Sequence, residues 1–197
     1  MLLTTELRIR YSQDYHLAEI RSQYQAELNR TVDQIQMYRG RYDDVSEDTK
    51  VPWYFIAIIH HMESDGNFHT HLHNGDSLSS RTHNDPTGRP PPPAVPPFTW
   101  SQSACDAILY EYAQVRPDTW TVSDILWALE KYNGWGYRNL TKYNCPNILT
   151  PYLWSFTTLY KSGKFVSDHH YSPYVVSDQA GAVAILKTLE ARNLVTL

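Results

Sequence analysis

The run from Val51 to Ile59, VPWYFIAII, constrains the fold of this chain more than any other segment. Its interior is almost entirely apolar, and Pro52 stands where the first turn of a helix accepts proline. The run is too short to cross a membrane. A helix that is apolar all round belongs in the interior of a protein. The sequence therefore predicts a central, buried helix that ends near Gly66.

Other segments also carry helical signals. Apolar residues recur at steps of three and four over residues 13–38, which predicts one amphipathic helix. Ser101 and Ser123 are expected to cap two further helices. The pair Thr150-Pro151 is expected to begin another, and Ser177 to cap the last.

The segment 66–98 has a different composition, with seven of the chain's 12 prolines and many Asn, Asp, Ser and Gly residues. This pattern predicts loops and a short hairpin, followed by an extended stretch, RPPPPAVPP. The stretch is either a linker between two domains or one wall of a cleft. We expect the wall, because each flank is too small to stand alone. The chain is thus expected to form a single, mainly α-helical domain over 1–197, in which a helical segment, 1–48, packs on a body formed by 49–197.

Charge and hydropathy exclude several classes of protein. The net charge is −4 and no run of Lys and Arg occurs, so nucleic-acid binding is not expected. The N-terminus has no apolar segment typical of a signal peptide, and no insertion into a membrane is expected. The chain is expected to be made in the cytoplasm and to reach any target in the cell wall only after release or delivery. Cys105 and Cys145 could pair, but two cysteines do not form a disulfide scaffold.

Aromatic residues are unusually frequent, with 15 Tyr, 6 Trp and 5 Phe. A domain of this size cannot bury all of them, so we expect several to line a cleft. Such clefts suit sugar rings, although any single aromatic residue can equally belong to the core.

Two carboxylates stand in contrasting settings near the end of the predicted central helix. Glu63 closes the apolar helix, and apolar surroundings raise the pKa of a carboxyl group. A protonated glutamic acid can donate a proton to a glycosidic oxygen. Asp76 follows in a His-Asn-Gly-Asp turn, where a carboxylate stays solvated and ionised. Glycoside hydrolysis requires two carboxylates with such different roles.

Thr82 lies six residues after Asp76. Its hydroxyl can donate to Asp76 and accept from a water molecule. The two residues would then hold a water on the face of a sugar opposite Glu63, which predicts inversion at the anomeric carbon. The alternative is that Asp76 only stabilises its own turn, a common use of aspartate.

These motifs resemble those of the lysozyme superfamily. Glu63-Ser64, followed by Asn67-Phe68, resembles the first motif of lytic transglycosylases and goose-type lysozymes, in which a Glu-Ser pair closing an apolar helix carries the catalytic acid. The order Glu63, Asp76, Thr82 is similar to the Glu-Asp-Thr triad of phage-type lysozymes, with a longer gap between Glu and Asp.

A later segment, Lys131-Tyr132-Asn133-Gly134, resembles the Tyr-Asn-Gly motif of the same enzymes, whose Tyr lies near the catalytic Glu. By this resemblance Tyr132 and Asn133 are expected beside Glu63. The Gly-Leu-Met-Gln motif of the superfamily is missing from the chain, which favours hydrolysis over transglycosylation.

The strings HLHNGD, RT, GRPPPP, YNGWGYR and PYLWS together are similar to a group of bacterial and phage lysozyme-like proteins, over roughly residues 50–165. The resemblance implies a lysozyme-like, mainly α fold with a small β-hairpin beside the catalytic helix. It implies an enzyme that cleaves the β-1,4 bond between N-acetylmuramic acid and N-acetylglucosamine in peptidoglycan glycan strands, without cofactor or metal. No particular oligomeric state is predicted. The residues expected to bind the glycan are His73, Asn74, Tyr132, Asn133, Trp135 and Tyr137.

Two rival interpretations remain. The sequence His69-x-His71-x-His73 on an extended strand would place three imidazoles on one face, as in a zinc site of a cell-wall metallohydrolase. The chain contains no HExxH motif, however. The other rival is a carbohydrate-binding protein with a lysozyme-like fold and no catalysis, since a fold alone does not imply activity.

Overall fold

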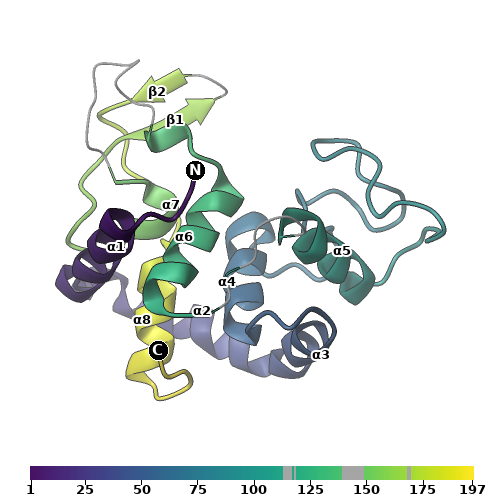
Figure 1. Cartoon of the computed structure of the whole chain (residues 1–197), viewed down its shortest axis with the longest axis horizontal. Helices are drawn as coiled ribbons and strands as arrows, with labels where there is room; N and C mark the ends of the chain where they lie inside the picture. Colours follow the sequence, from purple (N-terminus) through teal and green to yellow (C-terminus); the bar gives the residue numbers. More distant parts are fainter. Residues whose placement is uncertain (113–116, 118, 139–148, 168–169) are drawn as a thin grey trace. The chain divides into compact units, whose positions relative to one another are not determined.

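The computed structural model describes residues 1–112, 117, 119–138, 149–167 and 170–197 (Figure 1). The fold is mainly α-helical with one small antiparallel hairpin. The elements, in chain order, are α1 (Thr5–Leu17), the short 3-10 helix η1 (Ser22–Tyr24), α2 (Gln25–Met37), α3 (Arg39–Thr49), α4 (Trp53–Ser64), α5 (Trp100–Tyr112), α6 (Val122–Asn133), α7 (Pro151–Trp154), β1 (Lys164–Ser167), β2 (His170–Ser172) and α8 (Ala182–Ala191).

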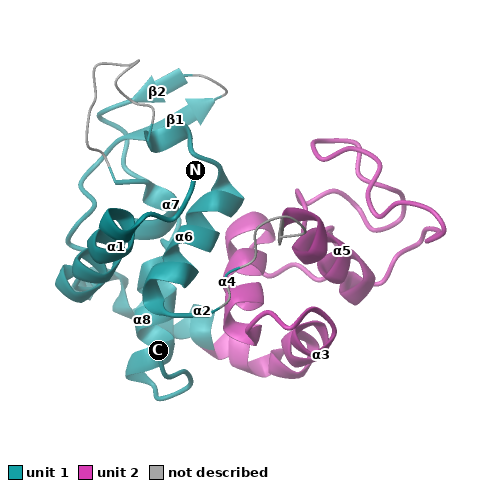
Figure 2. Cartoon of the chain, in the orientation of Figure 1, with its two compact units in different colours: residues 1–32, 117–197 teal, residues 33–116 magenta. Residues whose placement is uncertain are grey.

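The chain forms two compact units, coloured separately in Figure 2. Unit 1 comprises residues 1–32 and 117–197, and unit 2 comprises residues 33–116. Within unit 2, α3 packs on α4 and α5. The single domain over 1–197, with the segment 1–48 packed on a body formed by 49–197, stays a prediction.

Helix α4 is the core of unit 2. The five consecutive residues from Phe55 to Ile59 have no solvent exposure at all, so this helix is buried on all its faces. The prediction of a central, buried helix is therefore confirmed. The helix ends at Ser64 and is capped by Asp65, whose backbone adopts the left-handed conformation (φ 52°), and Gly66 continues with φ 71°. Two successive residues with positive φ turn the chain sharply out of the helix.

An aromatic cluster surrounds the last turns of α4. His60 is fully buried, and its ring lies 4.5 Å from the ring of Phe68 and 4.7 Å from that of Trp100. Its Nδ1 is hydrogen-bonded to the hydroxyl of Tyr42 at 3.0 Å. Burial lowers the pKa of His60 to about 4, because the charged imidazolium is poorly solvated there. The histidine is thus a neutral core residue.

The segment between α4 and α5 is a long loop that extends away from the helices of unit 2 (Figure 2). The hairpin of the fold is not in this segment. It is formed in unit 1 by β1 and β2, with Lys164 opposite Ser172. Between residues 66 and 98 the backbone makes a single isolated bridge, Thr70 with Ser77. Side chains of Asn and Asp bond the loop backbone in place of a ladder, and proline has no N–H to donate.

Unit 1 is built around α6, which packs on α1 and α7, while α7 packs on α8. The residues of α6 from Ile125 to Leu129 are buried. Glu130 follows them, also buried, and pairs with Arg138 through two bonds of 2.8 and 2.7 Å. The hydroxyl of Tyr11, from α1, donates to the same carboxylate. This triad joins α1, α6 and the segment after α6.

The single helix predicted over residues 13–38 is wrong, since residues 18–24 interrupt it. Ile20 leaves the helix to form an isolated bridge with Thr157. The guanidinium of Arg21 donates to the carbonyl oxygens of Thr157 at 3.0 Å and Tyr160 at 2.8 Å. Contacts with a segment more than 130 residues away therefore override the local helical pattern.

Most of the predicted helix caps are displaced by a few residues. Thr99, not Ser101, exchanges bonds with Gln102 at the start of α5. Thr121, not Ser123, forms a capping box with Asp124 at the start of α6. Threonine and serine are interchangeable as cap residues, so composition alone does not select between neighbours. The structure also shows where the helices α7 and α8 begin. The hydroxyl of Thr150 caps α7 as expected, whereas α8 begins at Ala182, not at Ser177.

Two further observations bear on the sequence predictions. In the part of the chain that the structure describes, no helix is both long enough and apolar enough to span a membrane. The thiol of Cys105 lies 3.7 Å from the carboxylate of Asp48, while Cys145 lies outside the described residues. Burial and the neighbouring Asp48 raise the pKa of the Cys105 thiol to about 11.

Candidate active site

Glu63 lies in the last turn of α4 and is half-buried. The polar turn that follows in the long loop comes back against this helix end. A Cβ atom placed on Gly75 would stand 3.7 Å from the carbonyl oxygen of Glu63. Gly75 has φ 78°, a conformation that glycine adopts without strain. The turn that carries Asp76 is therefore next to the end of α4, and both belong to unit 2.

The carboxylate of Asp76 accepts three hydrogen bonds from the loop that follows it. One oxygen accepts from the backbone N–H groups of His83 at 2.8 Å and Asn84 at 3.0 Å, and the other from the side-chain amide of Asn84 at 2.7 Å. These bonds, led by that from the Asn84 backbone, hold the pKa of Asp76 below its ordinary value. Asp76 is thus an ionised carboxylate, as predicted. The same bonds also agree with the alternative that it organises its turn.

Thr82 does not make the contact expected of it. Its hydroxyl donates its one hydrogen to the carbonyl oxygen of Pro86 and accepts from the backbone N–H of Arg89 at 2.9 Å. The expected donation to Asp76 is therefore wrong, because a hydroxyl has a single hydrogen. Thr82 is buried and pairs with Arg89 through the backbone as well, so it closes the loop 82–89.

His73 and Asn74, the two glycan-binding residues predicted in this loop, are both engaged within unit 2. The side chain of His73 is 1% exposed and bonded to Asp106 at 2.9 Å, so it supports the loop and does not reach the surface. The side chain of Asn74 accepts from the N–H of Asp76 and donates to the carbonyl oxygen of Asn84 at 3.1 Å. It stabilises the turn that carries Asp76.

The three alternate histidines do not share one face. His69 is exposed, whereas His71 and His73 are buried. The expected strand is absent, and a turn replaces it. His71 bonds the hydroxyl of Ser103 and the carbonyl oxygen of Ser80, both at 2.8 Å. Across the described residues, no group of three or more His, Cys, Asp or Glu side chains is arranged to hold a metal ion.

The remaining predicted residues belong to unit 1. Tyr132 and Asn133 form the last turn of α6, and Asn133 is exposed. Trp135 is half-buried, with its ring 6.3 Å from that of Trp127. The hydroxyl of Tyr137 accepts from the backbone N–H of Phe165 at 2.9 Å and so attaches this segment to the hairpin. Tyr132 belongs to unit 1 and Glu63 to unit 2, so the placement of Tyr132 beside Glu63 stays a prediction.

Sequence reasoning missed a buried polar network that ties the loop to α5. Asp106, on α5, accepts from His73 and also forms a two-bond ion pair with Arg89. Ser103, one turn earlier on the same helix, bonds His71. A signal was present in the sequence, because Ser103 and Asp106 are three residues apart and lie on one face of a helix.

No protein-family profile, curated protein or solved structure matches the chain at a significant level. The function is therefore inferred from the residues and from the geometry of unit 2.

Proposed function

We propose that this protein is a glycoside hydrolase of the lysozyme type that acts on peptidoglycan glycan strands, with Glu63 as its general acid. The observation that carries the proposal is the approach of the Gly75-Asp76 turn to the end of α4 at Glu63. It brings a half-buried carboxyl group and an ionised carboxylate into one region of unit 2.

The chemistry follows from the two environments. Glu63 ends a largely apolar helix in which the residues from Phe55 to Ile59 are fully buried. To act as a general acid there, it would have to hold its proton until the substrate is bound. Protonation of the glycosidic oxygen by Glu63 would let the sugar leave as an alcohol. Asp76, kept ionised by its hydrogen bonds, would stabilise the positive charge that develops on the sugar ring and hold the attacking water.

A water-holding role for Asp76 predicts inversion at the anomeric carbon. Three bonds from the loop use three of the roughly four acceptor positions of a carboxylate, which leaves one for a water molecule. Thr82 acts in this scheme only by closing the loop, since its hydroxyl is turned to Pro86 and Arg89. Fresh reducing ends in the α configuration are expected from the β-linked substrate, and β ends or 1,6-anhydro products would contradict inversion.

The substitution Glu63→Gln tests the assignment of the acid. The amide keeps the shape of the side chain but cannot donate the proton that the leaving oxygen needs, so clearing of a cell-wall suspension should fall at least about 100-fold. Asp65→Asn is the matched control, because it removes a carboxylate two residues further on that is 92% exposed. Circular dichroism should show both variants folded.

The outcomes separate the rival functions. A Glu63→Gln variant that retains a tenth or more of the activity would refute the acid assignment. Binding of wall fragments without any release of reducing ends by the unaltered protein would indicate a carbohydrate-binding protein. Loss of activity on addition of a chelator would favour a metallohydrolase.

A further inference from the structure

Asp106 joins the two ends of the loop segment that carries Asp76. One of its carboxylate oxygens accepts from Nε2 of His73 at 2.9 Å and from Nε of Arg89 at 3.0 Å, and the other accepts from the Arg89 guanidinium. His73 precedes the turn at Asp76, and Arg89 follows the loop that bonds the Asp76 carboxylate. A single side chain on a rigid helix thus fixes the segment 73–89 at both ends.

A second anchor lies beside the first. The hydroxyl of Ser103 is hydrogen-bonded to His71 at 2.8 Å and accepts from the backbone N–H of Leu72 at 3.2 Å. The backbone of His71 forms the base of the turn, since its N–H donates to the carbonyl oxygen of Asp76 at 2.6 Å and its carbonyl accepts from Gly75 at 2.9 Å. His71 and His73 therefore connect the turn that carries Asp76 to α5.

The order of carboxylate, imidazole and hydroxyl in Asp106, His73 and Ser103 is also that of a nucleophilic hydrolase triad. Two observations argue against that role. Ser103 is fully buried and lies 3.5 Å from His73, a longer distance than the 2.8 Å to His71. Its hydroxyl is thus engaged by His71 and closed to a substrate.

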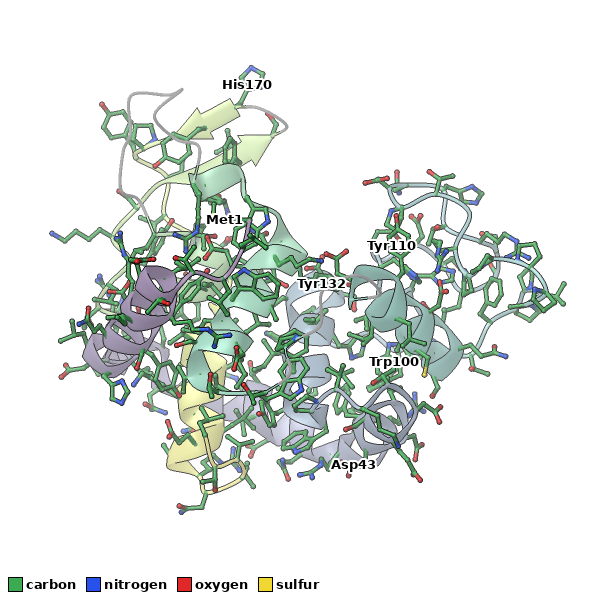
Figure 3. All side chains as sticks on the ribbon, in the orientation of Figure 1. Met1, Asp43, Trp100, Tyr110, Tyr132 and His170 are labelled. Carbon is green, nitrogen blue, oxygen red and sulfur yellow. The ribbon has the colours of Figure 1, made fainter. Side chains whose placement is uncertain are left out.

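We propose that Asp106 and Arg89 are positioning residues that clamp the loop 73–89 to α5 and so hold Asp76 in place for the reaction. The ion pair suits this role because a guanidinium and a carboxylate joined by two bonds fix orientation as well as distance. Both partners are largely shielded, with 21% of the Arg89 and 16% of the Asp106 side chain exposed. The guanidinium also lies 4.5 Å from the ring of Tyr110, which Figure 3 shows at the end of α5 beside the loop.

This inference rests on the proposed function, and its first readout is independent of activity. Arg81 lies inside the clamped segment, and its guanidinium donates to the carbonyl oxygen of Ala94. Trypsin can cut the Arg81–Thr82 bond only when the loop opens, whereas Arg89 is followed by proline and resists cleavage. In Asp106→Asn, which places an amide N–H against the donors of His73 and Arg89, cleavage at Arg81 should become at least tenfold faster.

The second readout is the kinetics of glycan cleavage. If the clamp positions Asp76, Asp106→Asn should lower kcat on soluble glycan chains at least tenfold while KM changes less than threefold. Arg89→Lys keeps the charge but loses the two-bond geometry and should show a smaller effect of the same kind, which guards against a variant that fails to fold. Asp44→Asn, an exposed carboxylate on α3 of the same unit, is the control and should change neither readout.

Each outcome decides between the ideas. Unchanged cleavage at Arg81 in Asp106→Asn would refute the clamp. Faster cleavage with unchanged kcat would show that the clamp exists but does not position a reacting group, which refutes the positioning role. Absence of glycan cleavage by the unaltered protein would refute the proposed function, and the positioning role with it, while the trypsin experiment would still judge the clamp.

Discussion

Replacement of Gly181 by alanine should destabilise unit 1 strongly for a change of one methyl group. Gly181 caps the start of α8 where this helix meets the end of α7. A Cβ atom at this position would stand 2.6 Å from the carbonyl oxygen of Leu153 and 2.6 to 2.7 Å from the backbone nitrogen and oxygen of Ser155. All three atoms are backbone, so no side chain can move aside.

The loss in the free energy of unfolding can be worked out from the movement of α8 that the new methyl group requires. Relief of the clash requires α8 to move away from α7, and overpacking of this kind typically costs about 1–3 kcal/mol. The same movement breaks the bond of 3.2 Å from the Gly181 N–H to the carbonyl oxygen of Ser155, which adds about 0.5–1.5 kcal/mol. We therefore expect a loss of about 2–4 kcal/mol. In a chain of 197 residues each kcal/mol lowers Tm by roughly 2–4 °C, so Tm should fall by about 5–15 °C.

Thermal and urea unfolding followed by circular dichroism measure this loss. Gly40→Ala is the matched control, because a Cβ at this exposed position of α3 meets no atom within 4 Å. There the change should stabilise the protein by up to about 1 kcal/mol, since alanine favours the helix. A Gly181→Ala variant as stable as the unaltered protein would refute the close approach of α7 and α8.

Two further predictions concern buried charged and titratable groups. Glu130→Gln should lower the free energy of unfolding by about 3–5 kcal/mol, because it leaves the guanidinium of Arg138 without its buried carboxylate partner. Asp178→Asn, at an exposed ion pair, is the control and should have no measurable effect. Equal losses in the two variants would contradict the burial of the triad. Stability should also fall on acidification from pH 6.5 to pH 4. Over this range His60 is protonated in the unfolded chain but stays neutral in the folded protein. The free energy of unfolding should therefore fall by about 1.4 kcal/mol per pH unit. Urea midpoints measured across this range should have a shallower slope in His60→Gln, and an unchanged slope would show that His60 does not contribute.

Local sequence patterns were sufficient for the central helix. An unbroken apolar run with proline at its start and glycine at its end specifies a buried helix without reference to the rest of the chain, and α4 follows it closely. The position of Glu63 at the end of this helix was predictable for the same reason. The ionised state of Asp76 was expected from solvation in its turn, whereas in the structure bonds from His83 and Asn84 lower its pKa.

Features that depend on distant partners were not predictable. The interruption of the first amphipathic segment depends on Arg21 and carbonyl groups more than 130 residues away. The direction of the Thr82 hydroxyl depends on how the loop closes at Arg89.

The partners of Asp106, His73 and Arg89, also depend on distant parts of the chain. The spacing of Ser103 and Asp106 places both on one face of a helix, but it does not specify which groups meet that face. The sequence alone determined where the apolar helix lies and which carboxyl group ends it. The tertiary structure decided which polar side chains find partners, because a hydrogen bond is fixed by the meeting of two groups in space, whereas helical periodicity belongs to a single stretch of chain.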